Sequence, residues 1–248
     1  MSDLLDSLCR DLIDEGDALA ATVGAADEAD LTRATFCPGW TVLHQLSHLE
    51  WTDLQLVRAL TDPEGFTSDA AAMPRRRVDE GARAGSERGA DACVRAWQAS
   101  RSRVIEAVRQ QPDSTRVPWF GPGMSITTAV TARIMETFAH GHDIADAVGA
   151  TVEPTARLRH VATLAWKARS YSFSVRGLEV PTTELRLEVR GIDGEIWSWG
   201  PDSAENRVGA DAYDFALLAT RRRIRADSSA STTGVDAERW LEVVQAYA

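Results

Sequence analysis

Four of the five histidines fall in two short segments, His44 and His48 in the first and His140 and His142 in the second. Glu136 precedes His140 by four residues, which places both side chains on one face of a helix, one turn apart. A carboxylate oxygen and an imidazole nitrogen at this spacing can bind one cation, and a histidine from a facing helix can complete the site. We therefore predict that His48, Glu136 and His140 bind a divalent metal ion.

Two imidazoles and one carboxylate leave at least one coordination position open, as catalytic zinc sites do. We expect zinc, although nickel, manganese and iron accept the same donors. A Glu and a His four residues apart also occur by chance on helices that bind nothing. His44 and His142 could orient a ligand, but a capping or solvent-exposed role is the more common one. Asp143 could accept a proton from an imidazole or form a pair on the helix surface.

Apolar side chains at helical spacing predict the elements that carry these residues. The predicted helices are 3–23, 40–60, 86–111 and 126–148. Ser125 is expected to cap the last helix, and Gly149 to end it. Four long amphipathic helices, two of them joined by a long connection, predict a four-helix bundle. The connection, residues 61–85, contains Pro74 and three arginines at 75–77, so we expect a solvated crossover loop that could act as a lid.

Beyond residue 150 the pattern changes. A helix is expected over 154–173, and alternating residues around a turn at 191–195 predict a β-hairpin. Two further helices are expected at 210–223 and 235–248. The chain should therefore be mainly α, with the bundle in residues 1–150 and a small α+β domain in residues 151–248.

Composition argues against several classes of partner. The 248 residues carry a net charge of -10, with a pI near 5.0, which opposes binding to nucleic acid. No apolar run approaches the length that spans a bilayer, and the acidic N-terminal segment does not resemble a leader peptide, so we expect a cytoplasmic protein. Cys9, Cys37 and Cys93 are too few and too scattered for a disulfide framework or a cysteine-rich metal site. We expect them to be reduced, and Cys37 to be structural.

Two strings carry a family resemblance: CPGWTVLHQLSHL at 37–49 and ETFAHGHDIADAVG at 136–149. Together they resemble the N-terminal domain of mycothiol-dependent maleylpyruvate isomerases, within the DinB-like metal-binding bundles. The resemblance implies a metal held by His48, Glu136 and His140. In an actinobacterial setting it also implies mycothiol as the thiol cofactor.

The tail, residues 197–223 and 232–248, resembles the C-terminal half of actinobacterial members, including a branch labelled as involved in wyosine base formation. The sequence has no iron–sulfur cysteine cluster for such radical chemistry, and its negative charge disfavours tRNA. In the string LLATR, the resemblance implies that Arg221 approaches the active site, where its planar fork could bind a carboxylate. The family's glycine is Thr220 here, and Arg221 could instead be a solvated charge after a helix.

The predicted function is that of a metal-dependent enzyme using a low-molecular-weight thiol, either an S-transferase or a thiol-assisted isomerase, with an electrophilic small-molecule substrate. A metal-bound thiol would ionise at neutral pH and attack this substrate. Two alternatives remain open: a non-enzymatic metal or ligand-binding protein, and a metal-dependent hydrolase with Asp143 or His142 as general base. Trp40, Trp51 and Trp119 are expected in the core or the pocket wall.

Overall fold

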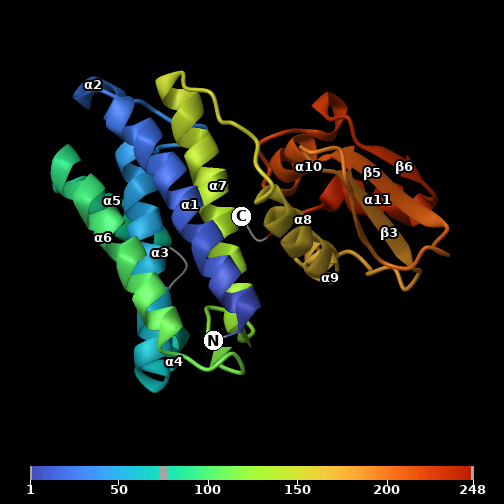
Figure 1. The fold of residues 1–248 in the computed structure, drawn as a ribbon, viewed down its shortest axis with the longest axis horizontal. Coiled ribbons are helices and arrows are strands. Elements are labelled where there is room, and N and C mark those ends of the chain that lie inside the picture. Colours follow the sequence, from blue (N-terminus) through green and yellow to red (C-terminus); the bar gives the residue numbers. More distant parts are fainter. Residues whose placement is uncertain (1, 73–76, 247–248) are drawn as a thin grey trace. The chain divides into compact units, whose positions relative to one another are not determined.

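The computed structural model describes residues 2–72 and 77–246. The chain divides into two compact units, Met1–Val152 and Glu153–Ala248 (Figure 1). The first unit is built on long helices, with α1 and α3 packed against α6 and α7. These helices are α1 (Asp3–Ala25), α3 (Val42–Thr61), α6 (Ala90–Arg109) and α7 (Ile126–Val148). The predicted mainly-α architecture, with a bundle ahead of an α+β part, is confirmed.

The ends of α7 follow from local chemistry. The hydroxyl of Ser125 accepts a hydrogen bond from the backbone N–H of Thr128 at 3.1 Å, so Ser125 caps the helix as predicted. Gly149 adopts a left-handed conformation, with φ of 73°, and ends the helix. The first strand pair of the chain, β1 (Arg116–Val117) with β2 (Met124–Ser125), leads directly into this helix.

The prediction of a loop at 61–85 is wrong, because two helices occupy most of this segment. The first is α4 (Pro63–Ala72). The carboxylate of Asp62 accepts a hydrogen bond from the N–H of Gly65 at 3.0 Å, and proline is tolerated in the first turn of a helix because its missing N–H would have no partner there. Here the proline therefore marks the start of a helix.

The second helix is α5 (Arg77–Ser86), which packs against α3. A Cβ atom on Gly81 would lie 2.5 Å from the ring of Trp51, and one on Gly85 would lie 1.8 Å from the hydroxyl of Ser47. These glycines therefore permit close helix packing, although the sequence pattern indicated a loop. Pro74 and the arginines at 75 and 76 lie outside the described residues.

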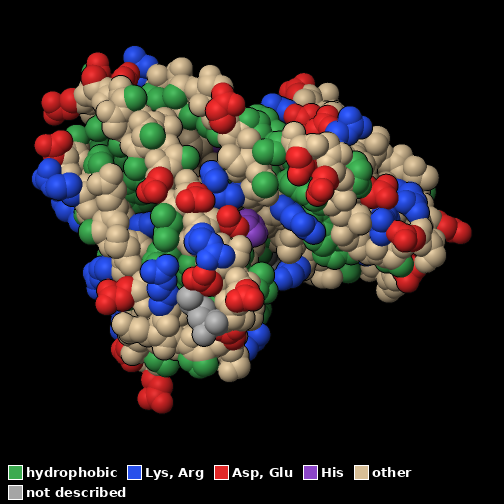
Figure 2. Space-filling model, in the orientation of Figure 1, with side chains coloured by type: hydrophobic (Ala, Val, Ile, Leu, Met, Phe, Trp, Pro, Cys, Tyr) green, Lys and Arg blue, Asp and Glu red, His purple; other side chains and the backbone are tan. Residues whose placement is uncertain are grey.

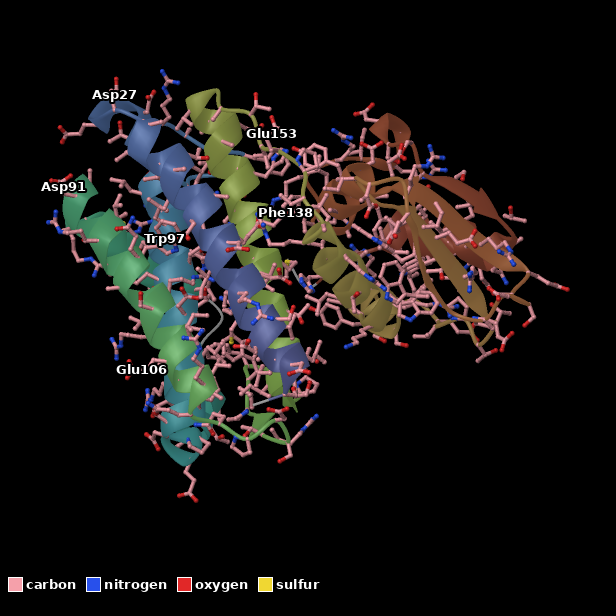
Figure 3. The ribbon with its side chains drawn as sticks, viewed as in Figure 1. Asp27, Asp91, Trp97, Glu106, Phe138 and Glu153 are labelled. Atoms are coloured by element: carbon pink, nitrogen blue, oxygen red, sulfur yellow. The ribbon has the colours of Figure 1, made fainter. Side chains whose placement is uncertain are left out.

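The core of the bundle has two apolar clusters separated by a polar layer. Leu12, Leu56 and Ile134 belong to one cluster, and Leu46 and Trp97 to the other. Figure 3 labels Trp97 and Glu106, which mark the buried and exposed sides of α6. The layer between the clusters contains the buried polar side chains Gln45, His48, Thr52, Asp53, Ser100, Arg101, Arg133, Thr137 and His140.

The second unit begins with α8 (Leu158–Lys167) and α9 (Arg169–Ser174). The single helix expected at 154–173 is therefore wrong. The chain changes direction near Ala168, which lets α9 pack against the C-terminal helix and bury Phe173. The hydroxyl of Ser172 donates to the carbonyl of Gln245 at 3.2 Å, so a tertiary contact stabilises the break.

A four-stranded sheet follows, in the order β4-β3-β5-β6. Its strands are β3 (Leu185–Arg190), β4 (Ile196–Trp199), β5 (Asn206–Asp211) and β6 (Ser231–Thr233). The predicted hairpin is β3 with β4, whereas β3 and β5 pair in parallel.

The helix expected at 210–223 is only partly correct. Its first two residues belong to β5, because they pair with β3, and the helix itself is α10 (Ala212–Ala219). The terminal helix is α11 (Val235–Val243), shorter than the expected 235–248. The chain is extended at Val244, and the N–H of Ala246 donates to the carbonyl of Ala219 at 2.8 Å. Residues 247 and 248 lie outside the described residues. The remaining short elements are α2 (Glu28–Leu31) and a 3-10 turn, η1 (Arg225–Asp227).

Acidic and basic side chains are interspersed over the face shown in Figure 2. This distribution offers no single-sign stripe on that face for a phosphate backbone. Among the described helices, none combines the length and hydrophobicity needed to cross a bilayer.

Candidate metal centre

His48, Glu136 and His140 converge within the polar layer of the bundle. His48 lies midway along α3, while Glu136 and His140 lie one turn apart on α7. The carboxylate oxygen Oε2 of Glu136 is 3.2 Å from Nε2 of His48 and 3.2 Å from Nε2 of His140. One ligand atom from each of the three residues lies within 4.8 Å of the other two. The structure therefore brings together the residues that helical spacing selected.

The spacing of these atoms fits one metal ion. Bonds of about 2.0–2.2 Å from zinc to nitrogen and oxygen separate the ligand atoms of a tetrahedron by roughly 3.3–3.5 Å. The two distances of 3.2 Å from Glu136 are close to that separation. Two imidazole nitrogens and a carboxylate oxygen are donors that zinc accepts, as do several neighbouring metals. The residues present therefore fit a divalent metal.

The electrostatics favour the protonation states that a metal requires. Burial lowers the pKa of His48 to about 4, with a further contribution from the charge of His140. Burial pushes the pKa of Glu136 upward, but hydrogen bonds with His140 and His48 and the charge of Arg133 outweigh it and hold this pKa well below its usual value. Near neutral pH the carboxylate is therefore ionised and the His48 imidazole is neutral, the forms that ligate a metal.

Gln45 fixes the orientation of His140, a role that the sequence reasoning missed. The side-chain nitrogen of this fully buried glutamine donates to Oδ2 of Asp143 at 3.3 Å and to Oγ1 of Thr35 at 2.8 Å. Since a carboxylate only accepts, the carbonyl oxygen of the amide must face the other way, toward Nδ1 of His140. The signal in the sequence was its position three residues before His48, which places Gln45 on the same side of α3.

The contact with Gln45 determines which nitrogen of His140 carries the proton and which faces the candidate metal position. The proton of a neutral His140 resides on Nδ1, where it is donated to Gln45, and Nε2 presents its lone pair to Oε2 of Glu136. Without a metal, a second proton on this ring would let Nε2 donate to Oε2 of Glu136, and a metal ion would take the place of that proton between the two atoms. A single metal ion would satisfy Glu136, His48 and His140 together.

Known proteins resemble this chain along most of its length. Residues 12–145, more than half of the chain, match the family model described as the mycothiol maleylpyruvate isomerase N-terminal domain. The chain belongs to this family. It is also 42% identical, over 238 residues, to an uncharacterized protein of Mycobacterium tuberculosis found in two strains, covering 95% of this chain and 91% of the relative.

Two solved structures share the fold. They are the crystal structures of the mycothiol-dependent maleylpyruvate isomerase and of a histidine-to-alanine mutant of that enzyme, each with a TM-score of 0.64. The identities are 18% and 19%, and the match covers 95% of this chain and 98% of each solved chain. The likeness at this identity shows the fold of the isomerase family, bundle and α+β part together.

Asp143 lies close to His140, one of the three candidate ligands. Its Oδ2 is 3.7 Å from Nδ1 of His140, and it accepts hydrogen bonds from Gln45 and, at 3.5 Å, from the thiol of Cys37. Asp143 therefore acts on His140 chiefly through Gln45. Cys37, expected to be structural, lies half-buried beside this carboxylate, and Cys37, His140 and Asp143 form a second close group of possible metal ligands.

His44 and His142, the other histidines of the two histidine-containing segments, contact residues outside the candidate site. Nδ1 of His44 accepts a hydrogen bond from the N–H of Thr41 at 3.2 Å, so His44 caps the start of α3. His142 lies 3.4 Å from a carboxylate oxygen of Asp146 and packs against Phe138. Neither belongs to the group of ligand atoms around Glu136.

One aromatic side chain, Trp40, lies against the two histidines of the site. The ring of Trp40 lies 5.2 Å from that of His48 and 6.1 Å from that of His140, centre to centre, so it forms one wall of the site. Trp51 and Trp119 instead belong to an aromatic cluster that includes Phe66 of α4. This cluster consists of Trp51, Phe66, Trp119 and Phe120.

Arg221, the arginine implied by the family resemblance, lies in the second unit directly after α10. Its side chain is exposed, and its backbone is left-handed, with φ of 67°. Glycine is the usual residue at such a position, because a side chain makes the left-handed conformation costly. A functional role of the Arg221 side chain would explain an arginine at a position where the backbone favours glycine.

Proposed function

We propose that this protein is a metal-dependent enzyme that uses a low-molecular-weight thiol, as an S-transferase or a thiol-assisted isomerase. The observation that supports it is the convergence of three metal-binding side chains from α3 and α7. Three protein ligands, rather than four, are typical of catalytic zinc sites, in which a remaining position accepts water or a substrate atom. Such a thiol enzyme would act in the cytoplasm, where thiols stay reduced.

His48, Glu136 and His140 would hold the metal, which we propose to be zinc. When bound, the metal would supply Lewis acidity that keeps a coordinated thiol ionised near neutral pH. The chain prepares this step through its own groups, since Gln45 sets the His140 tautomer and Trp40 covers the ligands with an apolar ring. Exclusion of water by that ring would strengthen each electrostatic contact at the site.

Mycothiol is the thiol we propose, because the matching family model and both solved neighbours are named for it. The electrophilic substrate would carry a carboxylate, for which Arg221 is the proposed partner. A guanidinium binds a carboxylate through two parallel hydrogen bonds, which suits an arginine to this role.

The hydrolase alternative has less support. Asp143 lies on the Nδ1 side of His140, while the metal-binding nitrogen of that ring is Nε2, and Asp143 already accepts hydrogen bonds from Gln45 and Cys37. His142 pairs with Asp146. Neither side chain belongs to the group of ligand atoms formed by His48, Glu136 and His140, beside which a general base would have to deprotonate a metal-bound water. A non-enzymatic metal-binding protein remains the competing hypothesis and is tested below.

Elemental analysis of protein purified without added metal should find about one metal ion per chain. His48→Ala and His140→Ala should lose the metal, because two protein ligands hold it too weakly, while the helical circular dichroism persists. His44→Ala serves as the matched control and should retain the metal, since His44 only caps α3. Retention of metal by both ligand variants would contradict the metal centre.

The thiol reaction is tested in cobalt-substituted protein. Titration with a cysteinyl-glucosamine thiol should produce sulfur-to-cobalt charge-transfer absorption, because a thiolate replaces water at the open position. If several thiols fail to produce this absorption while the metal stays bound, the protein binds metal without being a thiol enzyme.

A further inference from the structure

Arg133 is a buried arginine placed one turn before Glu136 on α7. Only 4% of the surface of this residue is exposed to solvent. The guanidinium lies over the ring of Trp119, 5.7 Å from the ring centre, and its Nη2 is 3.9 Å from Oε1 of Glu136. The proposed thiol mechanism assigns no role to this residue, although it is the charged side chain directly beside a metal ligand.

The two oxygens of Glu136 face different partners. Oε2 lies 3.2 Å from Nε2 of both His48 and His140, whereas Oε1 faces Arg133. A metal at the histidines attracts both oxygens, and a carboxylate that turns to bind through both occupies two coordination positions. The positive charge of Arg133 attracts Oε1 in the opposite direction. Competition between the two cations therefore decides how many positions Glu136 fills.

Two further buried charges, those of Asp53 and Arg101, interact electrostatically with Arg133. Asp53 of α3 is fully buried, and its Oδ2 lies 3.3 Å from Nε of Arg101 and 3.2 Å from the hydroxyl of Ser100. Burial raises the pKa of Asp53, and the charges of Arg101 and Arg133 oppose that rise. Arg101, Asp53, Arg133 and Glu136 thus form a group of balanced charges in the polar layer.

A contribution to folding stability does not explain why these four charged side chains are buried together. Burying ion pairs usually stabilises a fold no more than apolar side chains of the same size would. Among the described residues, Nη1 of Arg133 and Nη1 and Nη2 of Arg101 have no hydrogen-bond partner despite burial. Because Nη1 of Arg133 is covered, a dissolved substrate has little access to this guanidinium. Its nearest charged contact is Glu136, so it acts through that ligand.

We propose that Arg133 is a positioning residue that holds Oε1 of Glu136 away from the metal, so that Glu136 ligates through Oε2 alone and one coordination position stays open for the thiol. This inference rests on the proposed metal and thiol function. It adds a reason for the buried charges and for the stacking on Trp119, which fixes the plane of the guanidinium.

The test uses the visible spectrum of the cobalt-substituted full-length protein, recorded first without thiol. Arg133→Met should still bind cobalt but absorb more weakly, because Oε1 joins the metal and cobalt(II) with more ligands has weaker visible bands. Its affinity for a cysteinyl-glucosamine thiol should fall about tenfold or more, the usual effect of losing a partner of a metal ligand. Arg133→Lys keeps the charge on a single ammonium and should give intermediate values.

Arg109→Met is the control, since it removes an exposed arginine at the end of α6 and should leave the spectrum and thiol affinity unchanged. Wild-type spectra and affinities in Arg133→Met would overturn the proposal. If Arg133→Met does not fold, Arg133→Lys decides, and an unchanged spectrum in that variant overturns the proposal. Failure of the wild-type protein to bind thiol would count against the proposed function alone, because the thiol-free spectrum still reports how Glu136 binds.

Discussion

Replacing Gln45 with leucine should weaken the metal site without touching a metal ligand. Gln45 is fully buried and links His140 to Asp143 and Thr35 through its amide. Leucine has a similar volume but neither donates nor accepts hydrogen bonds. Gln45→Leu therefore removes the group that keeps the proton on Nδ1 of His140 and leaves the lone pair on Nε2.

The magnitude follows from the three hydrogen bonds that are lost. A net contribution of about 1 kcal/mol for each gives roughly 3 kcal/mol of unfolding free energy, and the loss of one hydrogen-bond donor to the buried carboxylate of Asp143 is included in this sum. Metal affinity should fall by about 10- to 100-fold, as when other residues that orient a ligating histidine are removed. Asp143 lies 3.7 Å from Nδ1 and could move closer, so the lower end of this range is the firmer expectation.

Metal affinity is measured by competition with a chromophoric chelator, and unfolding free energy by urea denaturation of the metal-free protein. Gln111→Leu is the matched control, because Gln111 donates only a long bond of 3.4 Å to the carbonyl of Leu60. It should change neither quantity appreciably. Metal affinity in Gln45→Leu within twofold of the wild-type value would refute the role assigned to this amide.

Two further predictions concern pH and substrate binding. The pKa of His48 is about 4 in the fold, below the usual 6.5, so the metal-free protein should lose up to about 3 kcal/mol of stability as pH falls from 6.5 to 4. Urea titrations across this range should show a shallower loss in His48→Leu, and an equal loss in both proteins would contradict this source of the pH dependence. Arg221→Ala should lower turnover of a carboxylate-bearing electrophile by about tenfold or more while metal content, from elemental analysis, stays unchanged. Unchanged turnover would leave Arg221 a surface residue.

Local signals were sufficient for the long helices. The apolar spacing in α1, α3, α6 and α7 predicted each helix, and Ser125 and Gly149 marked the ends of α7. The same spacing placed Glu136 and His140 on one face. These features depend on residues within a few positions of one another, so one sequence contains them completely.

The wrong predictions came from residue patterns that occur in more than one kind of local structure. Glycine and proline at 61–85 indicated a loop, but Pro63 begins α4 and Gly81 admits the ring of Trp51. The start of the expected helix at 210–223 is a strand, because β3 pairs with it. For Gly81 and for the strand, a partner far along the chain decides the outcome, whereas Pro63 begins a helix because proline is tolerated in its first turn.

The sequence by itself selected the candidate metal ligands, because residue types and helical spacing single out His48, Glu136 and His140. Only the tertiary structure revealed the residues that control these ligands. Gln45 contacts His140 across the bundle. Arg133 lies one turn from Glu136 on the same helix, but only the packing of the bundle shows that its guanidinium is buried and shares its surroundings with Asp53 of α3. Helical periodicity fixes which side chains share a face, but packing of α3, α6 and α7 decides which atom meets which.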